Sequence, residues 1–443
     1  MRLTVVLEAL GLSATRADPD CRLPAAEERL KGPSKHALTF IFFTVLIDTI
    51  AFGIVMPVLP KLLVALTGQT VAQVTFTAGW LLAIYAGLQF VFGPVIGNLS
   101  DRFGRRPVLL GALAAFTLEY FLMGFAPTVT WLFVGYTIAG VTGAVYSPSM
   151  AYIADASPPA KRAQAYGLVG AAFGLGFIVG AAVGGLLGEV GPRAPFFAAA
   201  ALAGLNFLYG VFVLPESLPA DKRRKFEWKR ANVFGTFIAF KHYPAVIGLA
   251  SAVFLWNLGY QVYPSTWSFY LQIQLGWSPA AIGVSFAYVG VLLVFTQAYL
   301  LGKIVPAIGE YWAVIVGAIS GVTSMLIMAF ATAGWSVYAA ITIGVLQGIA
   351  HPSMNAIMSR QAPPDQQGEL QGGIASLLAL AAVIGPLVMT QMLGRFSAPD
   401  APIHFPGAAF ILAAALSLIS LGLIVRAGAK LTAAPAPAHD PAE

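Results

Sequence analysis

The sequence predicts an all-α integral membrane protein in which twelve transmembrane helices form two pseudo-symmetric six-helix bundles. Three observations support this fold class. Of the 443 residues, 58% are hydrophobic and only 10% are charged, whereas soluble domains carry roughly 25% charged residues. Long apolar runs follow one another along the chain, and short motifs of the first half recur in the second. This composition excludes a soluble enzyme, a disordered scaffold and a collagen-like repeat.

Each apolar run is long enough to cross a bilayer, because about 20 residues at a rise of about 1.5 Å span the hydrocarbon core. The six runs of the first half lie near 36–65, 77–98, 108–126, 129–153, 165–188 and 195–214. Those of the second half lie near 244–272, 280–302, 311–331, 334–358, 370–394 and 405–427. Most of the glycine and proline falls inside these runs, as is usual for membrane helices, whose neighbours satisfy the freed backbone groups.

The basic residues predict the orientation. If the N-terminus is cytoplasmic, 22 of the 25 Lys and Arg residues fall on the cytoplasmic side, and only Lys61, Arg193 and Arg395 fall on the other. Because cytoplasmic loops are enriched in Lys and Arg, we expect both termini in the cytoplasm and the protein in the inner (cytoplasmic) membrane.

A polar, basic connection at 215–243 divides the chain into two halves of six helices. We expect a disordered cytoplasmic extension at 1–35, an N-terminal bundle at 36–214, a cytoplasmic linker at 215–243, a C-terminal bundle at 244–427 and a disordered cytoplasmic tail at 428–443. The linker's run Lys222–Arg224 is typical of a solvated loop, and a lipid-headgroup contact is the alternative.

The two halves are related by duplication. Pro148-Ser149-Met150 recurs as Pro352-Ser353-Met354, and Gly97, Gly104 and Gly180 pair with Gly302, Gly309 and Gly385. Most such pairs are 205 residues apart, and a fixed offset over several helices indicates a repeat. Transporters built from repeats bind their substrate near the midplane, between the halves, and move by alternating access.

The loop after the second run carries a specific motif. It reads Gly97-Asn98-Leu99-Ser100-Asp101-Arg102-Phe103-Gly104-Arg105-Arg106. This segment resembles the signature G-x-x-x-D-R-x-G-R-R of the major facilitator superfamily at every defined position. The resemblance implies that Gly97, Asp101, Arg102, Gly104, Arg105 and Arg106 control the conformational switch without touching the substrate. Asp101 is suited to accept charge-assisted hydrogen bonds from the arginines.

The first helix narrows the resemblance. Asp48 and the ending Gly53-Ile54-Val55-Met56-Pro57-Val58-Leu59-Pro60 look like the first helix of the tetracycline/proton antiporter group. The fifth helix and segments of the second half, such as Leu370-Gln371-Gly372, resemble that group too. The similarity covers nearly all of residues 36–427.

Two acids lie well inside predicted helices, Asp48 and Glu119. Both stand where the antiporter group has an acid. A carboxylate in the bilayer is costly and is a functional candidate by default, and a low-dielectric surrounding favours its neutral form. We therefore expect either acid to exchange a proton and to couple it to transport. The alternative is a neutral, hydrogen-bonded acid that stabilises helix packing.

Several positions depart from the antiporter pattern. Tyr136 stands where the fourth helix of that group has an Arg, and Gly180-Ala181-Ala182-Val183-Gly184-Gly185 lacks the proline of the fifth-helix motif. Leu293 and Gly321 replace a His and an Asp of the tetracycline exporters. These departures leave open whether tetracycline is a substrate and whether the usual proton relay operates.

His351 has no counterpart in the antiporter pattern and lies near the middle of the tenth run. Histidine titrates within the physiological pH range, so His351 is a candidate for proton or substrate handling. A hydrogen bond to a neighbouring helix is the alternative reading.

A substrate cavity is expected from polar and aromatic residues inside the helices. The candidates are Tyr85, Gln89, Tyr136, Tyr146, Asn257, Gln261, Trp267, Gln297, Gln347 and Asn355. Tyr85 and Gln89 are spaced i, i+4 and so share one face of their helix. An uncharged lining of this kind suits an amphiphilic organic molecule, although interhelical hydrogen bonding is an equally plausible role for each residue.

Other classes of function lack support in the sequence. No nucleotide-binding loop, catalytic triad or clustered metal ligands occur, and the single cysteine, Cys21, excludes a disulfide framework. We therefore expect a transporter and not an enzyme, with a small-molecule substrate, protons and the lipid bilayer as partners. The sequence predicts no cofactor beyond a proton gradient, no nucleic acid partner and a monomeric state.

These observations predict a secondary active transporter, and specifically a proton-coupled antiporter that exports small amphiphilic compounds, tetracycline-like drugs among them, by alternating access. One alternative is a metabolite importer or facilitator of the same fold. The other belongs to a different class, a membrane receptor or sensor that has lost transport.

Overall fold

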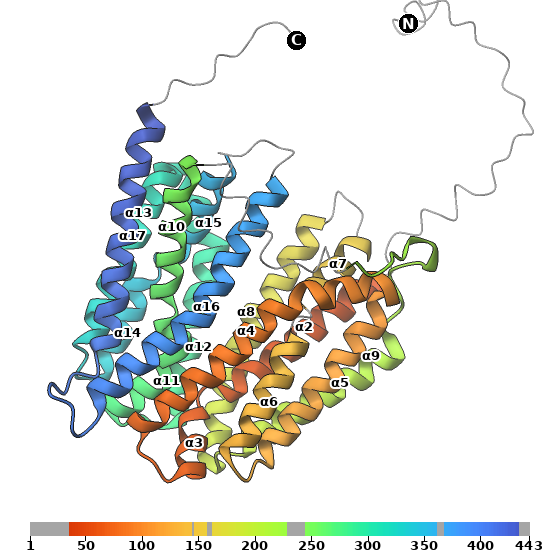
Figure 1. Cartoon of the computed structure of the whole chain (residues 1–443), viewed down its shortest axis with the longest axis horizontal. Coiled ribbons are helices and arrows are strands. Elements are labelled where there is room, and N and C mark those ends of the chain that lie inside the picture. Colours follow the sequence, from red (N-terminus) through yellow and green to blue (C-terminus); the bar gives the residue numbers. More distant parts are fainter. Residues whose placement is uncertain (1–34, 144–145, 157–161, 228–243, 361–366, 434–443) are drawn as a thin grey trace, which may run out of the picture.

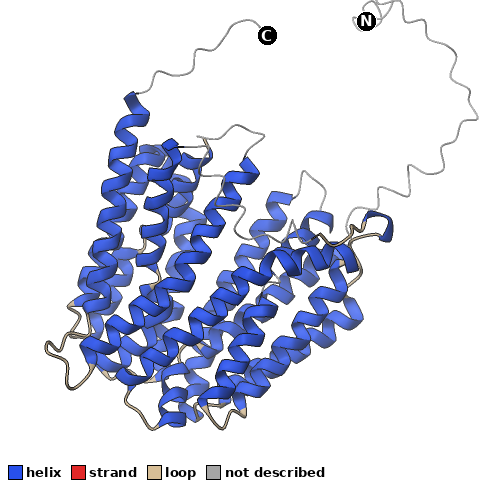
Figure 2. Cartoon of the chain, in the orientation of Figure 1, coloured by secondary structure: helices blue, strands red, loops and turns tan. Residues whose placement is uncertain are grey.

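The computed structural model describes residues 35–143, 146–156, 162–227, 244–360 and 367–433, and its regular elements are helices (Figure 2). Of the predicted disordered extension 1–35, residues 1–34 lie outside the described residues, and residue 35 begins the first helix. Of the predicted disordered tail 428–443, residues 434–443 lie outside them, whereas residues 428–433 are helical, because the last helix continues beyond its apolar run. In the first half the helices are α2 (Lys35–Val55), α3 (Leu59–Thr67), α4 (Val71–Phe103), α5 (Arg105–Gly124), α6 (Val129–Thr142), α7 (Tyr146–Ala156), α8 (Arg162–Val190) and α9 (Ala194–Val213).

The second half begins after the short helix η4 (Ala220–Lys222). Its helices are α10 (Pro244–Tyr260), α11 (Val262–Leu275), α12 (Pro279–Phe295), the π-helical turn η7 (Thr296–Leu300), α13 (Leu301–Ala329), α14 (Gly334–Gly344), α15 (Gln347–Ser359), α16 (Gln367–Ser397) and α17 (Ala408–Ala433). The predicted all-α fold is confirmed for the described residues.

The helices follow the twelve predicted apolar runs, although several runs are broken. By length and composition, seven of the described helices are able to cross a membrane, or eight if the bent pair α2 and α3 forms one span. Pro57 lies in that 48° bend, and Pro264 follows the break between α10 and α11. A proline ring clashes with the carbonyl group of the residue four positions earlier. For Pro264 this is the carbonyl of Tyr260, the residue at which α10 ends. Gly309, with φ 79°, separates two predicted spans within the continuous α13.

The helices form two bundles that meet at one end of the molecule (Figure 1). Within the N-terminal bundle α2 packs on α8 and α5 on α9, and within the C-terminal bundle α10 packs on α17 and α13 on α15. Between the bundles α4 packs on α16 and α8 on α12, and α11 contacts α3 and α4. We call the end that carries the loop 97–106 the basic face, and the end at which α3 lies the opposite face.

The bundles are packed tightly at the opposite face and separate toward the basic face. A Cβ built on Gly185 of α8 would lie 2.6 Å from the Pro279 carbonyl oxygen, and one on Gly174 would lie 3.2 Å from the Val294 side chain. Further along α8, a Cβ on Gly170 would meet no atom within 4 Å. Ser268 Oγ also donates to the Met56 carbonyl oxygen across the bundles at 2.9 Å. The space between the bundles therefore opens toward the basic face.

Candidate functional site

Arg105 is the centre of a charge network at the basic face. Its guanidinium contacts Asp101 Oδ1 at 2.6 Å and Asp155 Oδ2 of α7 at 3.2 Å, and it donates to Ser100 Oγ at 2.5 Å. The Arg105 side chain is only 10% exposed and is therefore shielded from solvent. Charge-assisted hydrogen bonds such as these are stronger than neutral ones. The network ties the end of α4, the start of α5 and the end of α7 together.

The other motif residues surround this network. The Gly97 carbonyl accepts a hydrogen bond from Ser100 Oγ at 2.8 Å. Arg102 lies over the neighbouring phenylalanine ring, 5.0 Å from its centroid, and Arg106 donates to the Val211 carbonyl oxygen of α9 at 2.8 Å. The loop is thus bound to its own bundle on several sides.

The segment 215–227, which we call the strap, folds back over the loop. Glu216 Oε1 accepts the backbone N–H of Arg105 at 2.9 Å and so caps the start of α5. The Arg224 N–H donates to the Asp101 carbonyl oxygen at 3.0 Å. Gly104 has φ 102°, a conformation that glycine adopts readily, and a Cβ there would collide with the Glu216 carboxylate. Glycine at position 104 therefore allows the backbone to turn and leaves room for the Glu216 side chain of the strap.

The second half repeats this arrangement with the charges reversed. Glu310 Oε1 accepts from Arg360 Nη2 at 2.6 Å. These positions lie 205 residues after Arg105 and Asp155, so an acid replaces a base and a base replaces an acid. Gly309 has φ 79° and, like Gly104, ψ 159°. The backbone of the duplicated loop is retained while its polarity is inverted.

Asp48 faces the interior of the N-terminal bundle. Its Oδ1 accepts Asn206 Nδ2 of α9 at 3.0 Å, and the same amide nitrogen donates to the Thr44 carbonyl oxygen at 3.2 Å. Asn206 is fully buried. The hydrogen bond therefore directs the carboxyl group of Asp48 toward α9, within the N-terminal bundle.

Glu119 lies deeper in the same bundle, on α5. Its side chain is 4% exposed, and its Oε2 has no hydrogen-bond partner among the described residues. Three tyrosines lie within electrostatic reach of its carboxylate: Tyr85, Tyr120 and Tyr136. Tyr120 is also within reach of Asp48. None of the ion pairs formed by the described residues includes either acid, so both lack a basic partner there.

A cavity of about 530 Å³ lies between the bundles, a size suited to a drug-like ligand. Most of its lining comes from α10, α11, α12, α14 and α15 of the C-terminal bundle, and α2 and α8 contribute a smaller part. The lining is mainly aromatic and aliphatic, with amide side chains and one imidazole. Such a surface binds apolar ring systems and orients them through a few hydrogen bonds.

The structure divides the predicted cavity residues into two groups. Asn257, Trp267, Gln297 and Gln347 line the cavity, as does His351. Asn355 and Gln261 are not among the lining residues. Asn355 Nδ2 lies 3.5 Å from His351 Nδ1, and Gln261 packs against Gly385 of α16.

The remaining predicted cavity residues belong to the first half. Tyr85, Gln89 and Tyr136 are on the N-terminal bundle near Glu119 and do not line the cavity. Gln89 Nε2 donates to the Gly143 carbonyl oxygen at 3.0 Å, and the Tyr85 and Tyr136 rings meet edge to face at 6.4 Å. The side chain of Tyr146 lies outside the described part of the structure.

Sequence reasoning missed the aromatic wall of the cavity. Trp256, Tyr260, Tyr263 and Trp267 follow one another at intervals of four, three and four residues and all line it. This spacing places side chains on one face of a helix, so the pattern was present in the sequence. Of these four residues, the predicted cavity includes only Trp267.

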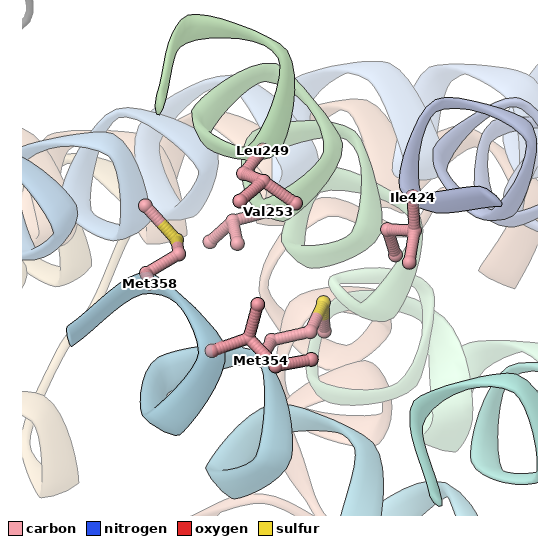
Figure 3. Close-up of a pocket in the computed structure, with 6 residues that line it drawn as sticks. Leu249, Val253, Met354, Met358 and Ile424 are labelled. Atoms are coloured by element: carbon pink, nitrogen blue, oxygen red, sulfur yellow. The ribbon is translucent and has the colours of Figure 1, made fainter. Parts of the chain in front are cut away.

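A second void lies within the C-terminal bundle (Figure 3). It measures about 10 Å³ and is lined by Leu249 and Val253 of α10, Met354, Ile357 and Met358 of α15, and Ile424 of α17. An apolar space of this size has no polar partners for a water molecule. It is a packing gap and not a binding site. Among the described residues, no group of three or more His, Cys, Asp or Glu side chains is placed to hold a metal ion.

Comparisons with known proteins agree with this geometry. The family model for the Major Facilitator Superfamily matches residues 41–386. The class C tetracycline resistance protein of Escherichia coli is 37% identical over 393 residues, which cover 89% of this chain and 97% of that protein. The class B tetracycline resistance protein of Escherichia coli is 36% identical over 347 residues, covering 77% of this chain and 85% of that protein.

Solved structures show the same fold. The human organic anion transporter MFSD10 superposes with a TM-score of 0.65 at 22% identity, covering 89% of this chain and all of that one. A bacterial homologue of the human lysosomal transporter Spinster, in an inward-facing and unoccupied conformation, superposes with a TM-score of 0.72 at 14% identity, covering 90% of this chain and 98% of that one.

The fold, the loop motif and the relatives thus lead to one family. The chain belongs to the Major Facilitator Superfamily, as a multi-pass membrane transporter of small molecules.

Proposed function

We propose that this protein exports small amphiphilic organic compounds in exchange for protons, by alternating access. The observation that carries the proposal is the pair of acids Asp48 and Glu119, which are enclosed in the N-terminal bundle without a basic partner among the described residues. An intramembrane acid of this kind is costly unless it has a function. The proton gradient takes the place of a cofactor.

The packing between the bundles supports alternating access. The bundles touch at the opposite face and separate toward the basic face, so the cavity is reached from the basic side. The excess of Lys and Arg supports a cytoplasmic location for that side, and we propose that both termini are cytoplasmic and that the protein acts as a monomer in the inner membrane. A substrate then enters from the cytoplasm and leaves when the opposite face opens, while protons travel inward through Asp48 or Glu119.

The relatives suggest which compounds to test first. Several are named tetracycline resistance proteins, so tetracycline is a candidate substrate. A resistance screen in a drug-sensitive host, with tetracycline among other amphiphilic drugs, identifies compounds whose toxicity the protein relieves.

The exchange itself is tested in everted membrane vesicles with an imposed pH gradient. We expect a transported compound to release protons from vesicles with the native protein and not from vesicles with Asp48→Asn or Glu119→Gln. Asp400→Asn makes the same change at an exposed loop acid and is expected to behave as the native protein. Accumulation that does not depend on the gradient would contradict the proposal and would favour a facilitator.

His351 is the imidazole in the cavity lining, and we propose that it contributes to substrate or proton handling. His351→Ala is therefore expected to change the Michaelis constant for the compound or the pH profile of transport. If both stay as in the native protein, the residue has no such role.

A further inference from the structure

The cavity belongs mainly to one bundle. Of the 25 described residues that line it, 20 come from the C-terminal bundle and five from α2, the turn after it and α8. A ligand that fills the cavity therefore makes most of its contacts with the half of the molecule that does not carry Asp48 and Glu119.

The lining residues that the structure describes carry no formal charge. There is no Asp, Glu, Lys or Arg among these described residues, and their polar groups are amides, hydroxyls and the imidazole of His351. Asp48 lies one helical turn from Phe52, which lines the cavity, but its carboxyl group is hydrogen-bonded to Asn206 of α9. Glu119 is buried between α5 and α6, near Gly135. A charged ligand would lose its hydration here without gaining a counter-charge, which is unfavourable.

A continuous ladder of aromatic rings crosses the cavity wall. The ring centroids of Tyr260 and Tyr263 are 5.6 Å apart, those of Tyr263 and Trp267 are 5.9 Å apart, and those of Trp267 and Phe286 are 6.2 Å apart. Phe286 in turn contacts Phe177 of the N-terminal bundle at 5.7 Å. These separations fall in the range in which aromatic pairs attract one another, so a flat ligand ring is able to extend the ladder.

Hydrogen bonds hold the middle of the ladder in place. Trp267 Nε1 donates to Ser285 Oγ at 3.0 Å, and the Tyr263 hydroxyl lies 3.3 Å from Ser324 Oγ. Trp267 is 3% exposed, whereas Tyr260 at the end of the ladder is 44% exposed. The buried rings are preorganised, and the exposed ring is accessible to a ligand.

We propose that the substrate is an uncharged polycyclic aromatic compound seated on this ladder, that it makes most of its contacts with the C-terminal bundle, and that Asp48 and Glu119 of the N-terminal bundle carry protons without contacting it. This inference rests on the proposed function and specifies its substrate class and the division of the two tasks. Because the protons and the substrate occupy separate sites, they are coupled through the movement of one bundle against the other.

Equilibrium binding to the purified full-length protein in detergent tests the charge preference without a gradient. The probe is tritiated acridone, an uncharged three-ring compound, in a scintillation proximity assay. N-methylacridinium and acridone-N-acetate keep the three rings and add a positive or a negative charge. We expect each to compete with acridone at least about tenfold more weakly than unlabelled acridone does, because the lining offers no counter-charge. Equal or stronger competition by either ion would overturn the proposal.

Variants test where the compound binds. Tyr260→Ala is expected to weaken acridone binding about tenfold through loss of a stacked ring, and the 44% exposure of Tyr260 makes this change compatible with folding. Trp335→Ala removes a ring that is 75% exposed and lies off the cavity, and it is expected to leave binding unchanged. If Tyr260→Ala binds acridone as the native protein does, the ladder is not the site.

Binding and proton release are measured separately to test whether the substrate and the protons use different residues. Asp48→Asn and Glu119→Gln are expected to bind acridone within about twofold of the native protein while losing substrate-induced proton release. Loss of acridone binding in either variant, with an unchanged elution profile in size-exclusion chromatography, would overturn the proposal. Acridone binding with the predicted pattern, together with gradient-independent transport in vesicles, would contradict the proposed proton coupling and not the binding site.

Discussion

A glycine stripe on α8 allows α2 to pack directly on its backbone. Gly176, Gly180 and Gly184 recur every four residues, and a Cβ on any of them would meet main-chain atoms of α2. At Gly176 the added atom would lie 2.7 Å from the Leu46 carbonyl oxygen and 2.8 Å from Thr49 Cβ. We predict that Gly176→Ala destabilises the N-terminal bundle and displaces the turn of α2 that carries Asp48.

The magnitude follows from the distances. An ordinary Cβ contact begins at 3.4 Å, so α2 and α8 would have to separate by about 0.7 Å at the Leu46 carbonyl. Overpacking of this kind costs about 1–3 kcal/mol, whereas alanine favours a helix over glycine by about 0.5–1 kcal/mol. The two effects have opposite signs, so a control variant is needed in which only the gain in helix propensity operates.

Gly170→Ala provides that control, because it lies two turns away on the same helix and a Cβ there would meet nothing within 4 Å. Thermal unfolding of both purified variants in detergent is the assay. Gly170→Ala is expected to unfold at or slightly above the native temperature. Gly176→Ala is expected to fall below Gly170→Ala by the equivalent of about 1–3 kcal/mol, with reduced proton release in vesicles. Equal unfolding temperatures for the two variants would refute the close crossing of α2 and α8.

Two further predictions concern the loop and the acid. Gly104→Ala is expected to lower the unfolding temperature more than Gly309→Ala does. Both glycines have positive φ, but only a Cβ at position 104 would collide with the Glu216 carboxylate. Equal decreases in unfolding temperature would show that backbone strain alone accounts for the loss. Asn206→Ala removes the buried donor to Asp48. It is expected to lower the free energy of unfolding by about 1–3 kcal/mol and to alter the pH profile of transport. An unchanged pH profile would show that this hydrogen bond does not position the acid.

Much of the fold was predictable because it depends on local properties of the chain. The length of an apolar run and its freedom from charge decide whether it spans a bilayer, and the helices of the structure follow the predicted runs. The break near Pro264 was not predicted, since one span was expected over 244–272, although its cause is local: proline removes a donor and crowds the preceding turn. The 205-residue offset indicated two related halves before any contact was known.

The site was predictable only in part. Asn257, Trp267, Gln297 and Gln347 line the cavity, whereas Tyr85, Gln89 and Tyr136 lie beside Glu119. All seven satisfy the same sequence criterion, a polar or aromatic side chain within an apolar run. Which face of a helix meets the cavity depends on how the helices rotate and pack, and this criterion carries no such information.

The sequence by itself determined the membrane class, the succession of spans, the duplication, the loop motif and the two intramembrane acids. These features depend on residue type and spacing, because the polarity of a segment determines whether it lies in the bilayer and its backbone forms a helix there. Only the tertiary structure decided that Asp48 turns toward Asn206, that the strap caps α5 through Glu216, and that the cavity belongs mainly to the C-terminal bundle. Each of these depends on contacts between residues more than 100 positions apart or on the side to which the two bundles open, and such contacts exist only once the helices are packed.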